Sequence, residues 1–253
     1  MKITFLGTGT SQGIPVINST HPVCLSIDKR DKRLRVSILV EWEDYTYVID
    51  CGPDFRYQIL RANVSKIDGI LFTHEHADHV AGIDDIRPFS FQIGEVPFYG
   101  DKRVLDNIKE RFGYIFETKD KYPGAPSVSL NTIENKSFQI GGIGVIPIKV
   151  LHGKLPIFGY RFNDFAYLTD VKTISGIEMK KLIGLKVLVI SALRIEPHYS
   201  HLSLSEALEI IDELKPERTY ITHISHKLGF HNEVEKSLPE NVFLAYDELI
   251  IEL

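Results

Sequence analysis

The segment LFTHEHADH, residues 71–79, constrains the fold of this 253-residue chain more than any other stretch. It ends an apolar run, and alternation along an extended chain would place His74 and His76 on the same side, while Asp78 and His79 come round as the chain turns. Imidazole and carboxylate groups bind divalent transition metals well. A lone H-x-H pair is weak evidence, but H-x-H-x-D-H supplies two ligand pairs that point in different directions. The segment therefore predicts a site for two neighbouring metal ions at the end of a strand.

Three further apolar runs end on residues of the same chemical kind. IPIKVLH ends at His152, FAYLTD at Asp170 and TYITH at His223. Each of these residues has an ordinary structural explanation when taken alone, because polar residues commonly lie where a strand leaves the core. Four such strand ends at one sheet edge would bury carboxylates at a cost that a metal ion offsets. We therefore expect these three side chains to complete the site.

The pattern of apolar runs predicts a mixed α+β fold. Successive strands are interrupted by helices at DFRYQILRA and DKRVLDNIKERFG, and hairpins are expected to turn at Gly141–Gly142 and Asn163–Asp164. A later helix, SLSEALEIIDELK, opens with the capping-box spacing of Ser203 and Glu206. No Gly/Ser-rich linker separates the two halves, so we expect one domain, residues 1–253, in which two sheets pack face to face with helices outside. Residues 114–130 hold aromatics, Pro and Gly without clear periodicity and are interpreted as a lid or rim.

The complete pattern resembles that of the metallo-β-lactamase-fold hydrolases, whose signature is this H-x-H-x-D-H loop with a later His, Asp and His. The resemblance covers the whole chain and implies a four-layer αββα sandwich with the site at one edge of the sheets. It also implies two divalent cations, with Zn, Mn and Fe all compatible with the ligand types. The implied ligand sets are His74, His76 and His152 for one ion and Asp78, His79 and His223 for the other, with Asp170 bridging them. The aspartate-glycine turn at Asp50 and Gly52 is implied to support the metal loop from behind.

Two cations about 3.5 to 4 Å apart would share a hydroxide and stabilise both the attacking and the leaving oxygen of a displacement. Metal binding lowers the pKa of water from 15.7 towards about 7, so a nucleophile exists without a serine or cysteine. Residues 5–15, FLGTGTSQGIP, resemble the start of the phosphodiesterase branch of the family. That branch includes the cyclic ribose-phosphate phosphodiesterase of phosphonate catabolism and, more distantly, the tRNA 3′-end processing endonucleases. The alternative for this Gly-rich turn is a purely structural loop.

A histidine before the helix SLSEALEIIDELK completes the catalytic expectation. In the phosphodiesterase branch a histidine at this place contacts the scissile phosphate, and His201 matches it better than His198 does. It lies two residues before the cap Ser203, where the helix favours an anion, so we expect His201 to protonate the leaving alkoxide. Asp170 is expected to orient the hydroxide. The alternative for His201 is a capping or hydrogen-bonded histidine.

A second metal site is implied for the N-terminal segment. In the phosphonate-pathway branch, cysteines after the GTGxxQGxP segment and a histidine three residues beyond the last metal ligand hold a structural zinc. This chain has Ser19, His21, Cys24 and His226 at the corresponding places. Histidine readily replaces cysteine as a zinc ligand, whereas serine is poor. One interpretation is a structural zinc on His21, Cys24 and His226, and the other makes Cys24 a small buried residue.

Charge restricts the substrate. The chain has 29 basic and 34 acidic residues, a net charge of −5, so no global positive field gathers polyanions. The tRNA-processing relatives carry a long inserted arm, and nothing of that kind is visible here. A large RNA is therefore disfavoured, and a small phosphodiester, either a cyclic nucleotide or a cyclic sugar phosphate, fits better. Arg87 and Arg194 are candidate phosphate ligands, with structural ion pairs as the alternative.

The remaining expectations concern location and rival functions. The chain has only two cysteines, which fits a reducing compartment, and its N-terminus lacks the apolar core of a signal peptide. No uncharged apolar stretch approaches about 20 residues, so we expect a cytoplasmic enzyme that does not span a membrane. A homodimer is left open. Two rival functions also stay open: hydrolysis of a carboxylic ester, thioester or lactone, and non-catalytic carriage of a metal or metabolite in cofactor biosynthesis.

Overall fold

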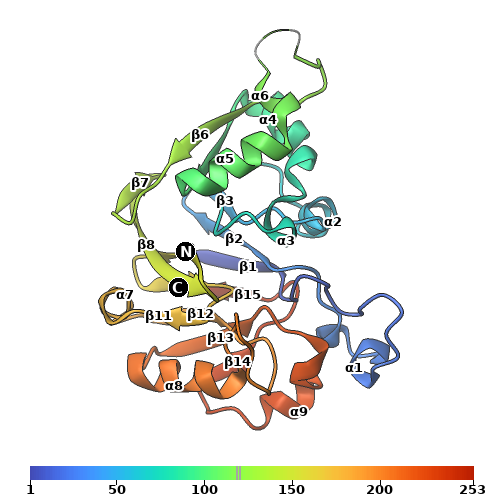
Figure 1. Cartoon of the computed structure of the whole chain (residues 1–253), viewed down its shortest axis with the longest axis vertical. Helices are drawn as coiled ribbons and strands as arrows, with labels where there is room; N and C mark the ends of the chain where they lie inside the picture. The colour runs from blue at the N-terminus through green and yellow to red at the C-terminus, as the bar shows by residue number, and fades with distance from the viewer. Residues whose placement is uncertain (118, 120) are drawn as a thin grey trace.

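The computed structural model describes residues 1–117, 119 and 121–253, which fold into four layers (Figure 1). Two sheets face each other, and helices cover their outer faces. The predicted α+β fold, an αββα sandwich, is therefore confirmed. Its assignment as one domain stays a prediction.

The first sheet is built mainly from the N-terminal half of the chain. Among the described residues it has seven strands in the order β15-β1-β2-β3-β4-β5-β6. The strands are β1 (Lys2–Gly7), β2 (Ser37–Trp42), β3 (Tyr45–Ile49), β4 (Gly69–Leu71), β5 (Val96–Gly100), β6 (Val128–Thr132) and β15 (Ile250–Glu252). The accompanying helices are α1 (Pro22–Leu25), α2 (Phe55–Arg61), α3 (Ala77–Val80), α4 (Arg87–Ile93), α5 (Lys102–Arg111) and α6 (Gly113–Phe116). Strands β3 to β6 run parallel, so their carboxyl ends lie at one edge.

The second sheet contains the later strands. Its order is β11-β8-β9-β10-β12-β13-β14, and β7 pairs with β8. The strands are β7 (Phe138–Ile140), β8 (Ile143–His152), β9 (Leu155–Phe162), β10 (Phe165–Leu168), β11 (Thr173–Ile174), β12 (Val187–Ser191), β13 (Arg218–Thr222) and β14 (Val242–Leu244). The helices are α7 (Gly176–Lys180), α8 (Leu204–Leu214) and α9 (His231–Glu235). The predicted hairpins are confirmed, because Gly141, Gly142 and Asn163 all take the positive φ that tight hairpin turns require.

The core has a central cluster between the sheets and one cluster beneath the helices on each side. The central cluster is rich in buried aromatic side chains from both sheets, including Phe5 on β1 and Tyr160 and Tyr167 on β9 and β10. The other two clusters pack the apolar stripes of the helices, such as Val104 and Ile108 of α5, onto the outer sheet faces. Burial of these apolar faces is the main force that fixes the two sheets against each other.

The segment after β1 is tied to the C-terminal part of the chain. The buried guanidinium of Arg33 donates to Thr8 Oγ1 at 2.8 Å and contacts His231 Nδ1 at 3.1 Å. The backbone continues this link, because Ile224 N donates to Thr8 O and Thr10 N donates to Ile224 O. These bonds hold the loop after β13 against the loop after β1.

The described parts of the 114–130 segment, residues 114–117, 119 and 121–130, follow α5 at the far end of the first sheet (Figure 1). They contain most of α6 and the start of β6. Residues 118 and 120 lie outside the described residues, so the interpretation of this segment as a lid or rim stays a prediction. Within the part of the chain that the structure describes, none of the helices combines the length and apolar character needed to cross a membrane.

Candidate metal centre

Three residues at strand ends adopt a left-handed backbone. Asp50 follows β3 with φ 64°, Asp170 follows β10 with φ 55°, and His223 follows β13 with φ 55°. Residues other than glycine seldom take this conformation, which costs about 1–3 kcal/mol and is found mainly where function requires it. The turn lets each chain leave its strand abruptly. As a result, three side chains from different strands are directed to the same edge of the sandwich.

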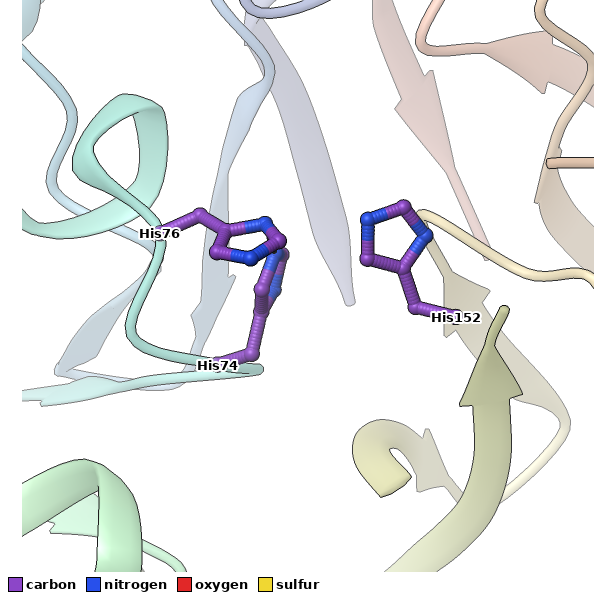
Figure 2. A group of neighbouring side chains, drawn as sticks. All are labelled: His74, His76 and His152. Atoms are coloured by element: carbon purple, nitrogen blue, oxygen red, sulfur yellow. Dashed lines mark hydrogen bonds between the residues drawn. The ribbon is translucent and has the colours of Figure 1, made fainter. Parts of the chain in front are cut away.

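The predicted ligands lie together at this edge. Nitrogen atoms of His74, His76 and His152 lie within 4.8 Å of one another, and Figure 2 shows the three imidazoles converging from two separate segments. The same 4.8 Å criterion groups the ligand atoms of Asp78, His79 and His223, and also those of His74, His79 and Asp170. Two of these groupings match the ligand sets that the family resemblance implied, and the grouping of His74, His79 and Asp170 crosses between the two sets. Their division between two ions stays a proposal.

Asp170 lies between the two ligand sets. Its Oδ2 is 3.2 Å from His79 Nε2, and its Oδ1 is 3.2 Å from His223 Nε2. These two imidazoles belong to one implied set, whereas the 4.8 Å groupings of Asp170 with His74 and with His152 bring it close to the other set, as a bridging ligand requires. The carboxylate is almost fully buried, so it needs a positive partner.

Among the described residues, several buried nitrogen atoms of the cluster have no partner in hydrogen-bonding geometry, even where an Asp170 oxygen lies 3.2 Å away. These atoms are His79 Nε2 and both ring nitrogens of His223, which are shielded from solvent. Buried polar atoms without a partner are uncommon and costly. Buried and unpaired donor atoms of the imidazole and carboxylate type fit a site for divalent transition metals. The residues present are thus suited to the ions that the fold implies.

Electrostatics within the cluster favour a cation. Burial raises the pKa of the Asp170 carboxyl, but the imidazoles of His223 and His79 outweigh burial and hold this pKa well below its usual range. Burial also lowers the pKa of His74, and the neighbouring His79 lowers it further. The carboxylate is therefore charged and His74 is neutral at neutral pH, the forms in which both groups bind a metal.

Asp50 supports the metal loop from behind. It is fully buried and accepts hydrogen bonds from Thr73 N and Thr73 Oγ1, both at 2.8 Å, and its Oδ2 lies 2.7 Å from His79 Nδ1. The contact with Nδ1 leaves Nε2 of His79 free to face the cluster. Gly52 is required at the same turn, because a Cβ there would lie 2.1 Å from Asp78 O.

Replacing Asp50 by asparagine should weaken metal binding about 10–100-fold, because a neutral amide cannot replace the carboxylate that contacts His79 Nδ1 and fixes the orientation of the ring. Competition titration with a chelator measures the change. Asp247→Asn is the matched control, since Asp247 is also a buried carboxylate that accepts from a backbone N–H and a threonine hydroxyl. Equal metal affinity in Asp50→Asn and the wild type would contradict the assigned support role.

His201 lies against the cluster on its other side. Its Nδ1 is 3.6 Å from Asp170 Oδ1, and its ring centroid is 4.5 Å from that of His152 and 5.1 Å from that of His223. Burial lowers the pKa of His201 to about 3, with His223 as the next cause. The position is suitable for a group that contacts a substrate held by the metals. Its role as the proton donor stays a prediction.

The backbone around His201 is fixed by contacts that sequence reasoning missed. His152 Nδ1 donates to Ser200 O at 2.8 Å, so the strand end and the loop before α8 are joined directly. The predicted capping box of Ser203 and Glu206 is present, and Lys172 Nζ contacts Glu206 Oε1 at 2.6 Å. Lys172 thereby links the chain after Asp170 to the start of α8. The only hint in the sequence was its position two residues after Asp170.

The two candidate phosphate ligands both have protein partners. Arg87 Nη2 lies 2.5 Å from Asp84 Oδ1, and Asp84 also accepts from Tyr114 Oη. Arg194 donates to the backbone oxygens of Glu196 and Pro197 at 3.1 and 2.8 Å. Arg87 thus has the structural ion pair that was named as its alternative, whereas Arg194 is held by backbone oxygens and not by an ion pair. A role in phosphate binding stays a prediction.

The implied structural zinc residues are only partly assembled. The rings of His21 and His226 lie 4.8 Å apart, but His21 Nδ1 accepts from Val23 N, and Cys24 Sγ is 3.5 Å from Val16 N. Within the described ranges, these side chains do not form a set of three ligand atoms that all lie within 4.8 Å of one another. The structure thus places the two imidazoles close together but does not group the Cys24 thiol with them. The structural zinc stays a prediction.

Comparison with known proteins identifies relatives along the whole chain. Residues 45–224 match the family model described as "Beta-lactamase superfamily domain". The chain is 37% identical over 252 residues to an octanoyltransferase of Porphyromonas gingivalis, covering 98% of this chain and 51% of that protein. It is 28% identical over 192 residues to a ribonuclease Z of Methanococcus maripaludis, covering 74% of this chain and 55% of that protein. The chain therefore spans about half the length of these curated relatives.

A solved structure is similar over nearly its full length. It is described as a new diphosphatase from the PhnP family, and it superimposes with a TM-score of 0.93 at 40% sequence identity. The match covers 100% of this chain and 97% of that chain. The similarity therefore includes every segment that contributes to the metal centre.

Proposed function

The chain belongs to the β-lactamase superfamily, in the metallo-β-lactamase fold that its sequence predicted, and from this premise we propose that it is a dinuclear metal-dependent hydrolase of small phosphodiesters. The observation that carries the proposal is the convergence of the predicted ligands. Imidazole and carboxylate groups from four strand ends lie at one edge. Asp170 lies 3.2 Å from nitrogens of His79 and His223. Its carboxylate also lies within 4.8 Å of His74 and of His152 from the other ligand set.

The residues of the site have distinct roles in this proposal. His74, His76 and His152 would hold one cation, Asp78, His79 and His223 the other, and Asp170 both. When bound, a cation pair lowers the pKa of water and neutralises charge on the phosphoryl oxygens. Asp170 would orient the attacking group through its two oxygens. The negative charge of a bound phosphodiester would favour the protonated form of the neighbouring His201, which would then donate its proton to the leaving oxygen.

The names of two relatives support phosphorus as the reaction centre. One is a diphosphatase at 40% identity over the whole chain, and the other is a ribonuclease Z at 28% identity. Both names describe cleavage of a phosphate ester or anhydride. We place the present chain with small substrates, because its net charge of −5 does not favour a long polyanion.

A second candidate is hydrolysis of an acyl ester or thioester. The observation that favours it is the 37% identity to the octanoyltransferase of Porphyromonas gingivalis. The chain aligns with 51% of that protein, so the named activity need not reside in the aligned half. A carbonyl oxygen polarised at the same cluster would serve this chemistry equally well.

Parallel assays of the metal-loaded protein separate the two candidates. The protein is first analysed for bound Zn, Mn and Fe, and is then assayed with bis(p-nitrophenyl) phosphate and with p-nitrophenyl octanoate and an octanoyl thioester. We expect about two metal ions per chain and turnover of the phosphodiester in large excess over both acyl substrates. Turnover of the acyl substrates alone would replace the first candidate by the second. Tight metal binding without turnover of any ester would favour the non-catalytic carrier.

A further inference from the structure

Hydrogen bonds hold the loop from Arg194 to His201 in place beside the candidate metal centre. Arg194 closes the loop on itself by donating to Glu196 O and Pro197 O at 3.1 and 2.8 Å. At the other end, Ser200 N donates to His198 Nδ1 at 3.3 Å, and Ser200 O accepts from His152 Nδ1 at 2.8 Å. The loop therefore has one defined shape, fixed both internally and to a predicted metal ligand.

A row of rings leads along this loop from the cluster into solvent. The His201 ring centroid is 4.5 Å from that of His152, and the His198 centroid is 5.1 Å from that of His201. The Tyr199 centroid is 4.7 Å from that of His198, at an interplanar angle of 34°. Tyr199 is 84% exposed. We call His198 and Tyr199 the ring pair.

The ring pair is uncharged and preorganised. His198 Nδ1 accepts a hydrogen bond, so the proton of the neutral imidazole is on Nε2, which is left as a donor. Burial lowers the pKa of His198, and Arg194 is the next cause, so the ring is neutral at neutral pH. Aromatic rings held in place offer a flat contact surface at little cost in conformational entropy.

Exposed tyrosines do not in general need a function. Tyr57 on α2 is 59% exposed, and the guanidinium of Arg61 on the same helix lies 5.6 Å from its ring centroid. Tyr199 differs in two respects, because its ring contacts a half-buried histidine and its loop also carries His201. Two ring contacts, Tyr199 with His198 and His198 with His201, separate Tyr199 from the predicted proton donor. This separation suits a substrate the size of a nucleoside phosphate rather than of a phosphate alone.

We propose that the ring pair binds the base of the substrate, so that the proposed phosphodiesterase acts on nucleoside phosphodiesters in preference to base-free sugar phosphates. The inference rests on the proposed function and specifies its substrate class. The base stacks on Tyr199, and His198 Nε2 donates to a carbonyl or ring nitrogen of the base. Stacking of this kind tolerates different bases, because every base has a π-face.

The test uses two substrates with the same reacting group. Adenosine 2′,3′-cyclic phosphate carries a base, and the 2,3-cyclic phosphate of 1-O-methyl ribose carries a methoxy group in its place. The wild-type, metal-loaded protein should show a kcat/KM at least about tenfold higher for the nucleoside substrate, mainly through a lower KM. Calorimetric binding of 5′-AMP and ribose 5-phosphate to the same protein gives a second, catalysis-free readout.

Three variants separate stacking from a structural role. Tyr199→Ala should lower the preference for the nucleoside substrate roughly tenfold, and Tyr199→Phe should retain it because the ring remains. Tyr57→Ala is the matched control, an exposed tyrosine on another element, and should keep the wild-type preference. An equal loss on both substrates in Tyr199→Ala would assign the residue to the stability of the loop and overturn the inference.

Failure of the inference and failure of the proposed function give different results. Equal kcat/KM of the wild type for both cyclic phosphates would overturn the inference that the ring pair binds the base, but would leave the proposed phosphodiesterase activity intact. If the metal-loaded wild type cleaves neither cyclic phosphate, the calorimetric comparison alone tests base binding by the ring pair. The proposed function fails as well if bis(p-nitrophenyl) phosphate is not cleaved either. Equal affinity for 5′-AMP and ribose 5-phosphate would then overturn base binding by the ring pair, whereas tighter 5′-AMP binding that is lost in Tyr199→Ala would support it.

Discussion

Replacement of Asp170 by alanine should eliminate phosphodiesterase turnover, with a loss of about three orders of magnitude or more, and should release at least one metal ion per chain. Asp170 is the carboxylate whose two oxygens lie 3.2 Å from His79 Nε2 and His223 Nε2. Its removal would leave those two imidazoles without the negatively charged group that lies between them. Metal analysis of the purified variant and turnover of bis(p-nitrophenyl) phosphate measure both effects.

Two further variants interpret the result. Asp164→Ala removes an aspartate from the preceding hairpin, where Asp164 pairs with Lys186 at 3.0 Å outside the cluster, and both metal content and turnover should stay near wild type. Asp170→Asn retains a residue type that tolerates the left-handed backbone, so it separates loss of charge from backbone strain. Full metal content in Asp170→Ala would refute the bridging assignment.

Replacement of His201 by alanine should lower turnover about 10²–10⁴-fold and leave the metal content unchanged. The reason is that His201 lies beside the cluster, with Nδ1 3.6 Å from Asp170 Oδ1, without belonging to either implied ligand set. Loss of a proton donor affects the leaving group, so kcat should fall more than KM changes. Steady-state kinetics and metal analysis of the same preparation provide the two readouts.

The matched control for this variant is His231→Gln, which alters a buried histidine paired with Arg33 and Glu235 away from the metal centre. Its turnover should remain within a few-fold of wild type once folding is verified. Loss of metal together with turnover in His201→Ala would make His201 a ligand, a role compatible with its grouping with His152 and Asp170. Wild-type turnover would remove His201 from the mechanism.

The fold and the cluster were accessible from the sequence because both rest on local patterns. An apolar run that ends on a histidine or aspartate indicates in the sequence both a buried strand and a polar strand end. Four such ends predicted the sheet edge at which His74, His152 and His223 meet. The capping box of Ser203 and Glu206 is likewise encoded within four residues.

Other features depend on contacts between distant segments. The bond from His152 to Ser200 joins residues 48 positions apart, and the Lys172–Glu206 pair spans 34 positions. The partners of Arg87 and Arg194 were close in sequence, but a basic residue near an acidic or turn segment has many possible partners. The positive φ of His223 had no sequence signal either, because histidine takes this conformation more often than most residues other than glycine but still only in a small minority of cases.

The proposed metal centre would draw its ligands from both sheets of the sandwich: residues 74–79 follow a strand of the first sheet, whereas His152, Asp170 and His223 lie at strand ends of the second. Ions bound there would fasten the N-terminal and C-terminal halves together without a covalent bond. Their binding energy would then count towards the stability of the folded state as well as towards catalysis. For such a protein, metal supply would govern how long the enzyme persists, in addition to how fast it works.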